Sequence, residues 1–226
     1  LRLKLAETPM FENLRNSGKV SKLPLLEAFT KYPRYILLGV AIAAGHSVLA
    51  YTSTGYIFPF LTQVVKLDAV AVNTAVGIAA ALQFPFYILN AYLADRIGRR
   101  PIYLAGLVMG LLTYYPIYSW LTAARDLSLI TAAVFLLVLA TAFTFGVLGT
   151  AMAELFPTSV RYTGMAVSFN IGIGLFGGFT PSIVQYIGMA VGNPLAGVVF
   201  YTYAVVLFAL ATAYFLLPET ARRELQ

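Results

Sequence analysis

Charged residues in this chain are gathered into short clusters, and the stretches between the clusters are long and uncharged. Five such stretches occur, at residues 35–65, 69–94, 101–124, 127–153 and 162–218. A helix needs about 20 apolar residues to cross a bilayer core of about 30 Å. Each of the first four stretches therefore fits one membrane span, and the fifth, more than twice the required length, fits two.

The fifth stretch divides at a cluster of turn-forming residues, Gly188, Gly192, Asn193 and Pro194. We therefore expect an all-α membrane protein with a six-helix transmembrane bundle over residues 35–217. The expected spans lie near 36–62, 69–93, 101–121, 127–151, 163–187 and 195–217. Helices of a soluble protein would pair an apolar stripe with a charged face, and these stretches have no charged face.

The distribution of positive charge predicts the orientation in the membrane. Thirteen of the 15 Lys and Arg residues lie in four segments that fall on one side, namely 1–34, 95–100, 154–161 and 218–226. The other side holds only Lys66 and Arg125. Because cytoplasmic loops carry the excess of Lys and Arg, we expect both termini in the cytoplasm, with 1–34 as a loop and 218–226 as a tail. The net charge of +6 is then a topology signal, and no nucleic-acid partner is expected.

The composition narrows the function. The chain has no Cys and a single His, which removes disulfides, thiolate metal sites, Cys nucleophiles and multi-His zinc sites. No nucleotide-binding loop or catalytic triad is present, so we expect no enzyme, no catalytic residue, no metal and no cofactor. The chain begins at Leu1 with a hydrophilic segment that lacks the apolar core of a signal peptide. We expect it to be a piece of a longer protein.

Three charged motifs lie on the expected cytoplasmic side. They are Asp95-Arg96-Ile97-Gly98-Arg99-Arg100, the run from Glu154 through Phe156, Pro157, Thr158, Val160 and Arg161 to Gly164, and Pro218-Glu219-Thr220. In the first motif, Gly98 allows the positive φ that a tight turn between two helices requires, and the arginines can pair with carboxylates across the bundle. The alternative is a loop that only fixes the topology.

The first motif resembles the signature loop of the major facilitator superfamily. The second, followed by the glycine-rich run 176–181, resembles its metabolite:proton symporter family, which includes proline/betaine, citrate, 2-oxoglutarate and shikimate transporters. The resemblance covers nearly the whole chain. It implies the C-terminal half of a twelve-helix fold, with 1–34 as the central cytoplasmic loop and an N-terminal six-helix half as the missing partner. One position departs from the motif, because Ala91 stands where the family usually has Gly; we expect looser helix packing there.

The resemblance also implies that the charged motifs form a cytoplasmic gate. Its expected members are Asp95, Arg96, Gly98, Arg99, Arg100, Glu154, Arg161 and Glu219. We expect Arg99 or Arg100 to pair with Glu154, and Arg161 with Glu219, when the cytoplasmic side is closed. Opening toward the cytoplasm would break these pairs, so the network would have two arrangements.

His46 is the one Asp, Glu, Lys, Arg or His residue inside the expected spans. It lies about 16 Å into the first span by helical rise, near the midplane, where an ionisable residue is a functional candidate. Its unperturbed pKa of about 6.5 suits a proton carrier or a donor to a carboxylate substrate. The alternative is a neutral His that bonds a neighbouring helix. Ser53 and Tyr56 extend nearly the same helix face.

Other polar side chains within the spans complete the expected substrate and proton pathway. Gln83, Tyr87 and Asn90 form a stripe on one face of the second span, although such amides also hold helices together. The expected pathway residues are His46, Ser53, Tyr56, Gln83, Asn90, Thr141, Thr144 and Asn170. We expect Tyr114, Tyr115 and Tyr118 at the outer membrane interface.

Together these patterns predict secondary active transport of a small polar metabolite, an organic acid or a zwitterion such as proline or betaine, across the inner membrane. The expected mechanism is proton symport with alternating access, and the expected partners are the substrate, a proton, the lipid bilayer and the N-terminal half. A sugar-type facilitator or symporter is one alternative, because its terminal Pro-Glu-Thr motif is similar. A six-helix oligomeric channel or membrane scaffold is another, although no pore helix shows the repeated polar stripe of a channel.

Overall fold

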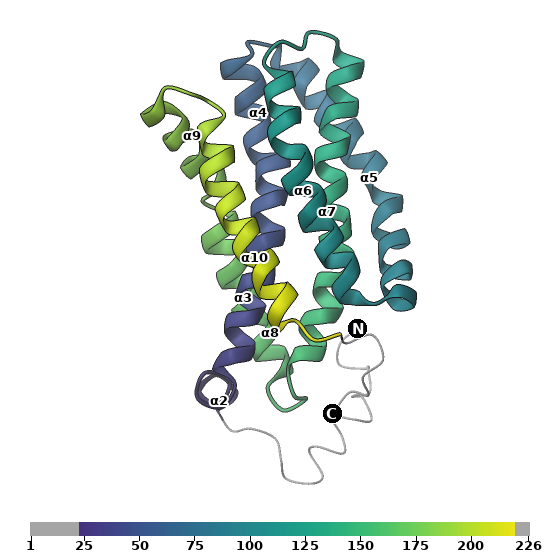
Figure 1. The fold of residues 1–226 in the computed structure, drawn as a ribbon, viewed down its shortest axis with the longest axis vertical. Helices are drawn as coiled ribbons and strands as arrows, with labels where there is room; N and C mark the ends of the chain where they lie inside the picture. Colours follow the sequence, from purple (N-terminus) through teal and green to yellow (C-terminus); the bar gives the residue numbers. More distant parts are fainter. Residues whose placement is uncertain (1–22, 220–226) are drawn as a thin grey trace, which may run out of the picture.

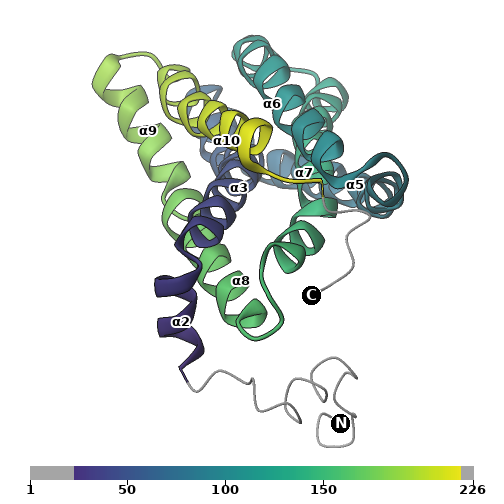
Figure 2. The same ribbon diagram turned by 60° about the horizontal axis from the view of Figure 1, so that its bottom comes forward.

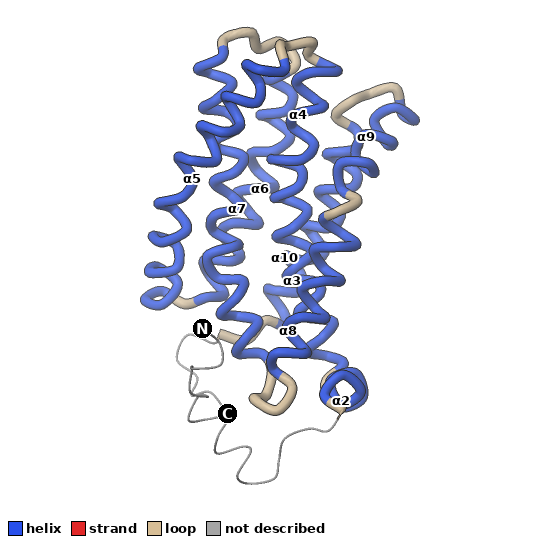
Figure 3. Tube along the Cα trace, turned by 180° about the vertical axis from the view of Figure 1, so that it is seen from behind, coloured by secondary structure: helices blue, strands red, loops and turns tan. Residues whose placement is uncertain are grey.

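The computed structural model describes residues 23–219, and this part of the chain is a bundle of helices without strands (Figures 1 and 3). Six helical segments are long and apolar enough to cross a membrane. They are Pro33–Val64, Ala69–Ile97, Arg99–Leu121, Leu127–Leu155, Arg161–Val191 and Val198–Leu216. The all-helical, six-span architecture predicted from the sequence is therefore confirmed.

The first span occupies the middle of the bundle. It follows a short helix, α2 (Pro24–Lys31), and contains α3 (Pro33–Tyr51), η2 (Thr52–Tyr56), α4 (Ile57–Pro59) and η3 (Phe60–Val64), where η marks a π-helical segment. Helix α3 lies between α7, α8 and α10 (Figure 2). Most of its side chains are therefore buried, and the helix is apolar on every face.

The second, third and fourth spans are single uninterrupted α-helices: α5 (Ala69–Ile97), α6 (Arg99–Leu121) and α7 (Leu127–Leu155). The carboxylate of Asp68 accepts the backbone N–H of Ala71 at 2.9 Å and so caps α5. Asp126 caps α7 in the same way, accepting from Ser128 at 2.8 Å. These two carboxylates satisfy N–H groups that have no partner inside the helix, which explains acidic residues between apolar spans.

The fifth and sixth spans are interrupted. The fifth contains α8 (Arg161–Asn170), η4 (Ile171–Gly177) and α9 (Thr180–Val191), and the sixth contains η5 (Val198–Thr202) and α10 (Tyr203–Leu216). Gly192 ends α9 in the left-handed region with φ 71°, within the turn predicted from the sequence. Figure 1 shows α9 leaning away from the tops of the other helices.

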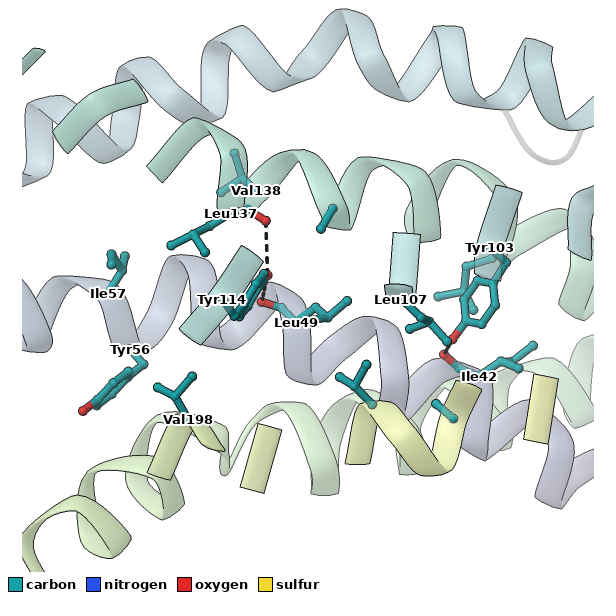
Figure 4. Packing of buried hydrophobic residues seen from close by; sticks show 14 of the residues in the cluster. Ile42, Leu49, Tyr56, Ile57, Tyr103, Leu107, Tyr114, Leu137, Val138 and Val198 are labelled. Carbon is teal, nitrogen blue, oxygen red and sulfur yellow. Dashed lines mark hydrogen bonds between the residues drawn. The ribbon is translucent and has the colours of Figure 1, made fainter. Parts of the chain in front are cut away.

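A row of buried tyrosines on α6 fastens that helix to α3 (Figure 4). The hydroxyl of Tyr103 donates to the Ile42 carbonyl at 2.5 Å, and that of Tyr114 donates to the Leu49 carbonyl at 2.9 Å. The hydroxyl of Tyr118 donates to the carbonyl of Thr52, the first residue of η2, at 2.5 Å.

The expectation that Tyr114 and Tyr118 lie at the outer interface is therefore wrong, since both are fully buried. Tyrosine has a polar hydroxyl on an apolar ring, and this combination is common at the membrane surface. It is equally stable between packed helices when the hydroxyl can donate to a backbone carbonyl. Tyr115, by contrast, is 45% exposed.

Small residues allow α3 to approach the fifth span closely. A Cβ added to Gly39 would lie 2.7 Å from the Ser168 hydroxyl, and one added to Gly177 would lie 2.7 Å from the Ser47 Cβ. Between these two contacts, Gly172 lies directly against Ala43. The contacts recur every four residues along α3, at 39, 43 and 47, but at 168, 172 and 177 along the fifth span. The π-helical segment η4 takes up the additional residue.

Candidate functional site

The imidazole of His46 joins α3 to α7. Its Nδ1 lies 2.8 Å from the Thr144 hydroxyl, and that hydroxyl donates to the Thr141 carbonyl at 3.1 Å. A threonine has one hydroxyl hydrogen, so this arrangement assigns the Nδ1 hydrogen to His46 as the donor. Nε2 is then the unprotonated nitrogen, and it has no hydrogen-bond partner among the described residues.

Gln83 extends the same network to α5. Its amide nitrogen donates to the Val138 carbonyl at 2.5 Å and to the Thr141 hydroxyl at 2.6 Å. Four of the expected pathway residues thus meet at the crossing of three helices: His46, Gln83, Thr141 and Thr144. All four side chains are buried.

Asn90 lies two turns further along α5, beside Gly146 of α7. It is 1% exposed, and its amide nitrogen is buried without a hydrogen-bond partner. A Cβ on Gly146 would lie 3.3 Å from the Asn90 Cβ and 3.3 Å from the backbone nitrogen of Ala91. The close helix approach that Ala91 was expected to loosen is therefore present, because the glycine stands on the opposite helix.

Besides Asn90, three expected pathway residues lie outside this network. The Ser53 hydroxyl donates to its own helix, at the Leu49 carbonyl, 2.9 Å away. The Tyr56 hydroxyl donates to the Pro194 carbonyl at 3.0 Å. Asn170 is exposed and donates to the Ala166 carbonyl of its own helix at 2.7 Å. These contacts are those of helix packing and chain connection, and a transport role for the three residues stays a prediction.

Phe145 is a neighbour of His46 that the sequence analysis missed. Its ring centroid lies 5.2 Å from that of His46 and 5.3 Å from that of Tyr87. Phe145 is 48% exposed and Leu136 is 44% exposed. The nine residues between these two positions make two and a half turns of α-helix, so the two side chains leave opposite sides of α7. The only sequence signal was the position of Phe145 next to Thr144.

Arg99 connects three elements, α5, α6 and α7, at one end of the bundle. Its guanidinium forms an ion pair with Glu154, with both side chains 12% exposed, and a second one with Asp95 at 3.3 Å. The predicted pairing of Arg99 with Glu154 is thus present in the structure. It ties the α5–α6 turn to the last turn of α7.

Glu219 fastens the chain beyond α10 to the same turn. Its carboxylate accepts the backbone N–H groups of Arg99 at 2.9 Å and Arg100 at 3.3 Å, which places a negative charge at the N-terminus of α6. Gly98 adopts φ 120° and lies directly against Glu219. A side chain at position 98 would meet both a strained backbone and this carboxylate.

The other residues expected to form the gate make local contacts. The Arg100 guanidinium donates to the Tyr214 carbonyl and lies 5.5 Å from the centroid of the Tyr214 ring. Arg96 lies over the ring of Tyr92 at 4.6 Å. Arg161 donates from Nε to the Phe156 carbonyl at 3.1 Å, and its pairing with Glu219 stays a prediction. The described residues include no group of His, Asp and Glu that could hold a metal ion.

The fold and the arrangement of charged motifs define the class, a six-helix half of a major facilitator fold. The family model described as "Sugar (and other) transporter" matches residues 5–226. The chain belongs to this family of membrane transporters.

Curated relatives share about 28–30% of residues. The chain is 28% identical over its full length to the putative proline/betaine transporter of Staphylococcus aureus, and it covers 48% of that protein. It is 28% identical to the ectoine/proline transporter ProP of Corynebacterium glutamicum, over 83% of this chain and 39% of the relative. It is 30% identical to the citrate-proton symporter of Salmonella typhi, over 81% and 42%. The chain thus spans about half the length of these relatives or less, and no solved structure matches it significantly.

Proposed function

We propose that this chain forms the C-terminal half of a proton-coupled secondary transporter for a small polar metabolite, an organic acid or a zwitterion such as proline or betaine. The proposal places both termini in the cytoplasm and the bundle in the inner membrane. An N-terminal six-helix half would supply the other wall of the substrate site. Family membership and the names of the relatives support the transport of a metabolite.

The state of His46 is the observation that carries the coupling to protons. Because Thr144 fixes the hydrogen on Nδ1, Nε2 presents a lone pair, which does not attract a carboxylate. Protonation of Nε2 turns it into a charged donor that binds a carboxylate. A proton and a carboxylate-bearing substrate would therefore bind together, which is the requirement of symport.

The charged cluster supports alternating access. The pair of Arg99 and Glu154 joins the α5–α6 turn to α7, and Glu219 joins the end of the sixth span to the same turn. In the proposed cycle these contacts hold the cytoplasmic ends together, and opening toward the cytoplasm breaks the ion pair. Two discrete arrangements of one network are the kind of element that such a transition needs.

Uptake by the full-length protein in proteoliposomes tests the proposal. Radiolabelled betaine, proline, citrate and a hexose are offered with and without an inward proton gradient. We expect the gradient to drive accumulation of one of the first three, and His46→Gln to remove the response to the gradient. Uptake that ignores the gradient would overturn symport, and uptake of the hexose alone would favour the sugar-type alternative.

A further inference from the structure

Helix α2 lies across one end of the bundle, where the first span begins. Its last residue, Lys31, is separated by a single residue from Pro33, the first residue of that span. Figure 1 shows α2 end-on while the spans stand upright, and Figure 2 shows it beside α8. Since the spans cross the membrane along the long axis of the bundle, α2 lies along the surface of that membrane.

The outer surface of α2 has an apolar face and a polar face. The residues of the apolar face are 46–59% exposed, and they are Leu25, Leu26 and Phe29. The residues of the polar face are Glu27, Thr30 and Lys31. Successive residues of an α-helix are about 100° apart, so the two faces lie on opposite sides of the buried Ala28, while α2 packs against α3 and α8. A helix held in this way can turn one flank to lipid and the other to water.

A pair of tyrosines marks this level as the membrane interface. The rings of Tyr32, directly after α2, and Tyr35, in the first turn of α3, have centroids 6.1 Å apart. Unlike Tyr114 and Tyr118, Tyr35 is exposed. Exposed tyrosines gather at the level of the lipid headgroups, which is also the depth at which an amphipathic helix buries its apolar face. The apolar face of α2 is therefore at the right level to contact lipid.

Basic residues beside α2 favour anionic headgroups. Lys31 and Arg34 are both exposed, and residues 1–34 hold seven Lys and Arg residues against three Glu residues. The ion pair of Lys31 with Glu27, at 3.0 Å, leaves this excess of positive charge in place. A leaflet that contains anionic phospholipid offers an apolar layer to the apolar face and counter-charges to these residues.

We propose that α2 is an interfacial anchor. Its apolar face inserts into the leaflet at this end of the bundle, and Lys31 and Arg34 bind the headgroups of anionic phospholipids. Because α2 packs against α3 and α8, the leaflet holds the starts of the first and fifth spans. The inference requires only that the bundle spans a membrane, so it stands or fails independently of the substrate and of proton coupling.

Spin labels on the two faces of α2 test the insertion. The chain contains no Cys, so Phe29→Cys and Thr30→Cys are labelled one at a time in the full-length protein, after any Cys elsewhere is replaced. The protein is placed in nanodiscs of phosphatidylglycerol and phosphatidylcholine. We expect the label at position 29 to collide with oxygen, which concentrates in lipid, and to be protected from a water-soluble nickel chelate. The label at position 30 is the matched control and should show the reverse.

Two outcomes of this experiment would overturn the insertion. A label at position 29 that collides with the chelate as readily as the label at position 30 would place the apolar face in water. A label at position 29 that is immobile and protected from both reagents would show that a protein surface covers this face, as the N-terminal half could.

Brominated lipids test the choice of headgroup. A fluorophore on Phe29→Cys is quenched in equimolar mixtures in which either the phosphatidylglycerol or the phosphatidylcholine carries bromine. We expect stronger quenching by the brominated phosphatidylglycerol, with an enrichment of up to about fivefold for each basic residue that binds it.

Charge variants decide which residues cause this enrichment. The Lys31→Gln, Arg34→Gln double variant should lose most of it. The Lys66→Gln, Arg125→Gln double variant removes the same charge between other spans and should keep it. Equal quenching by the two brominated lipids in the wild type, or equal losses in the two double variants, would overturn the assignment of anionic headgroups to Lys31 and Arg34.

Discussion

The spans formed by α5, α6 and α7 differ from the other three in the regularity of their backbones. The first group consists of continuous α-helices, although α5 contains Pro85 and α6 contains Pro116. Each span of the second group contains at least one π-helical segment. Proline alone is therefore not what interrupts a helix in this bundle.

The two groups are also held together differently. Within the regular group, Gln83 bonds α7 from α5 and Arg99 bonds α7 from the α5–α6 turn. Within the interrupted group, glycine lets α3 and the fifth span approach closely. Serine hydroxyls then donate to backbone carbonyls across the contact, Ser47 to Gly172 at 3.0 Å and Ser168 to Ile36 at 3.3 Å. His46 lies where the groups meet, bonded from α3 to α7. Since π-helical turns often mark functional segments, we expect the interrupted spans to bend at these segments, while the regular group changes its arrangement at the ion pair of Arg99 and Glu154.

Loss of the ion pair at the base of the regular group should have the largest effect. Arg99→Ala leaves the carboxylate of Glu154 buried without its counter-charge, which costs about 3–5 kcal/mol for buried pairs. We expect a lower melting temperature in detergent and no uptake. Arg125→Ala, at an exposed position between α6 and α7 at the other end of the bundle, is the control and should change neither. The Arg99→Glu, Glu154→Arg double variant should recover part of the uptake. The gate is contradicted if Glu154→Arg alone leaves transport unchanged and the double variant rescues nothing.

His46→Gln tests the contact between the groups. Glutamine can still donate to Thr144 but cannot take up a proton, so we expect the protein to fold with the wild-type melting temperature and to lose the dependence of uptake on the proton gradient. Uptake is measured at several external pH values in the same vesicles. Normal transport with an unchanged pH profile would reduce His46 to a packing residue.

Gly172→Ala tests the close approach inside the interrupted group. The new methyl group would contact Ala43 and the backbone of α3, and such overpacking costs about 1–3 kcal/mol. Gly174→Ala is the matched control because nothing lies within 4 Å of a Cβ at that position. We expect the melting temperature to fall for the first variant only; equal shifts would show that the approach is not tight.

Tyr118→Phe should have the smallest effect. It removes the hydroxyl that donates to the Thr52 carbonyl at the start of η2, and a single buried hydrogen bond contributes about 1 kcal/mol. The melting temperature of Tyr118→Phe is compared with that of Tyr115→Phe, whose ring is exposed. A larger loss for the Tyr115 variant would contradict the role of the buried row.

The number and order of the spans were predictable because charge is expensive inside a bilayer, and the uncharged stretches mark the spans directly. The bounds of α2 were not predicted, since residues 1–34 were interpreted as one loop from their charges. The burial of Tyr114 and Tyr118 was missed for a physical reason. Lipid tails and helix interiors are equally apolar, so hydrophobicity does not distinguish the two faces of a span.

The site was predictable in its residue types and not in its partners. Polar side chains inside a membrane span are costly and indicate a structural or functional role. For this reason the sequence analysis selected His46, Gln83, Thr141 and Thr144. That His46 bonds Thr144, 98 residues away, depends on the crossing of α3 and α7, which no local pattern encodes. The contact of Phe145 with His46 was missed because Phe145 is one of 16 phenylalanines, and only its neighbours in space distinguish it from the others.

The unequal spacing of the contacts between α3 and the fifth span has a consequence for how this segment could have arisen. The segment η4 holds one residue more than an α-helix would need between Gly172 and Gly177. It behaves as a single-residue insertion that the chain has absorbed locally. Deleting one residue inside η4 would restore the four-residue spacing and an α-helical turn, and the side chains that follow would keep their present faces. Deleting one residue from the regular α-helix of this span would instead rotate everything that follows by about 100° about the helix axis. The π-helical segment is therefore where the length of the fifth span can change at the smallest cost.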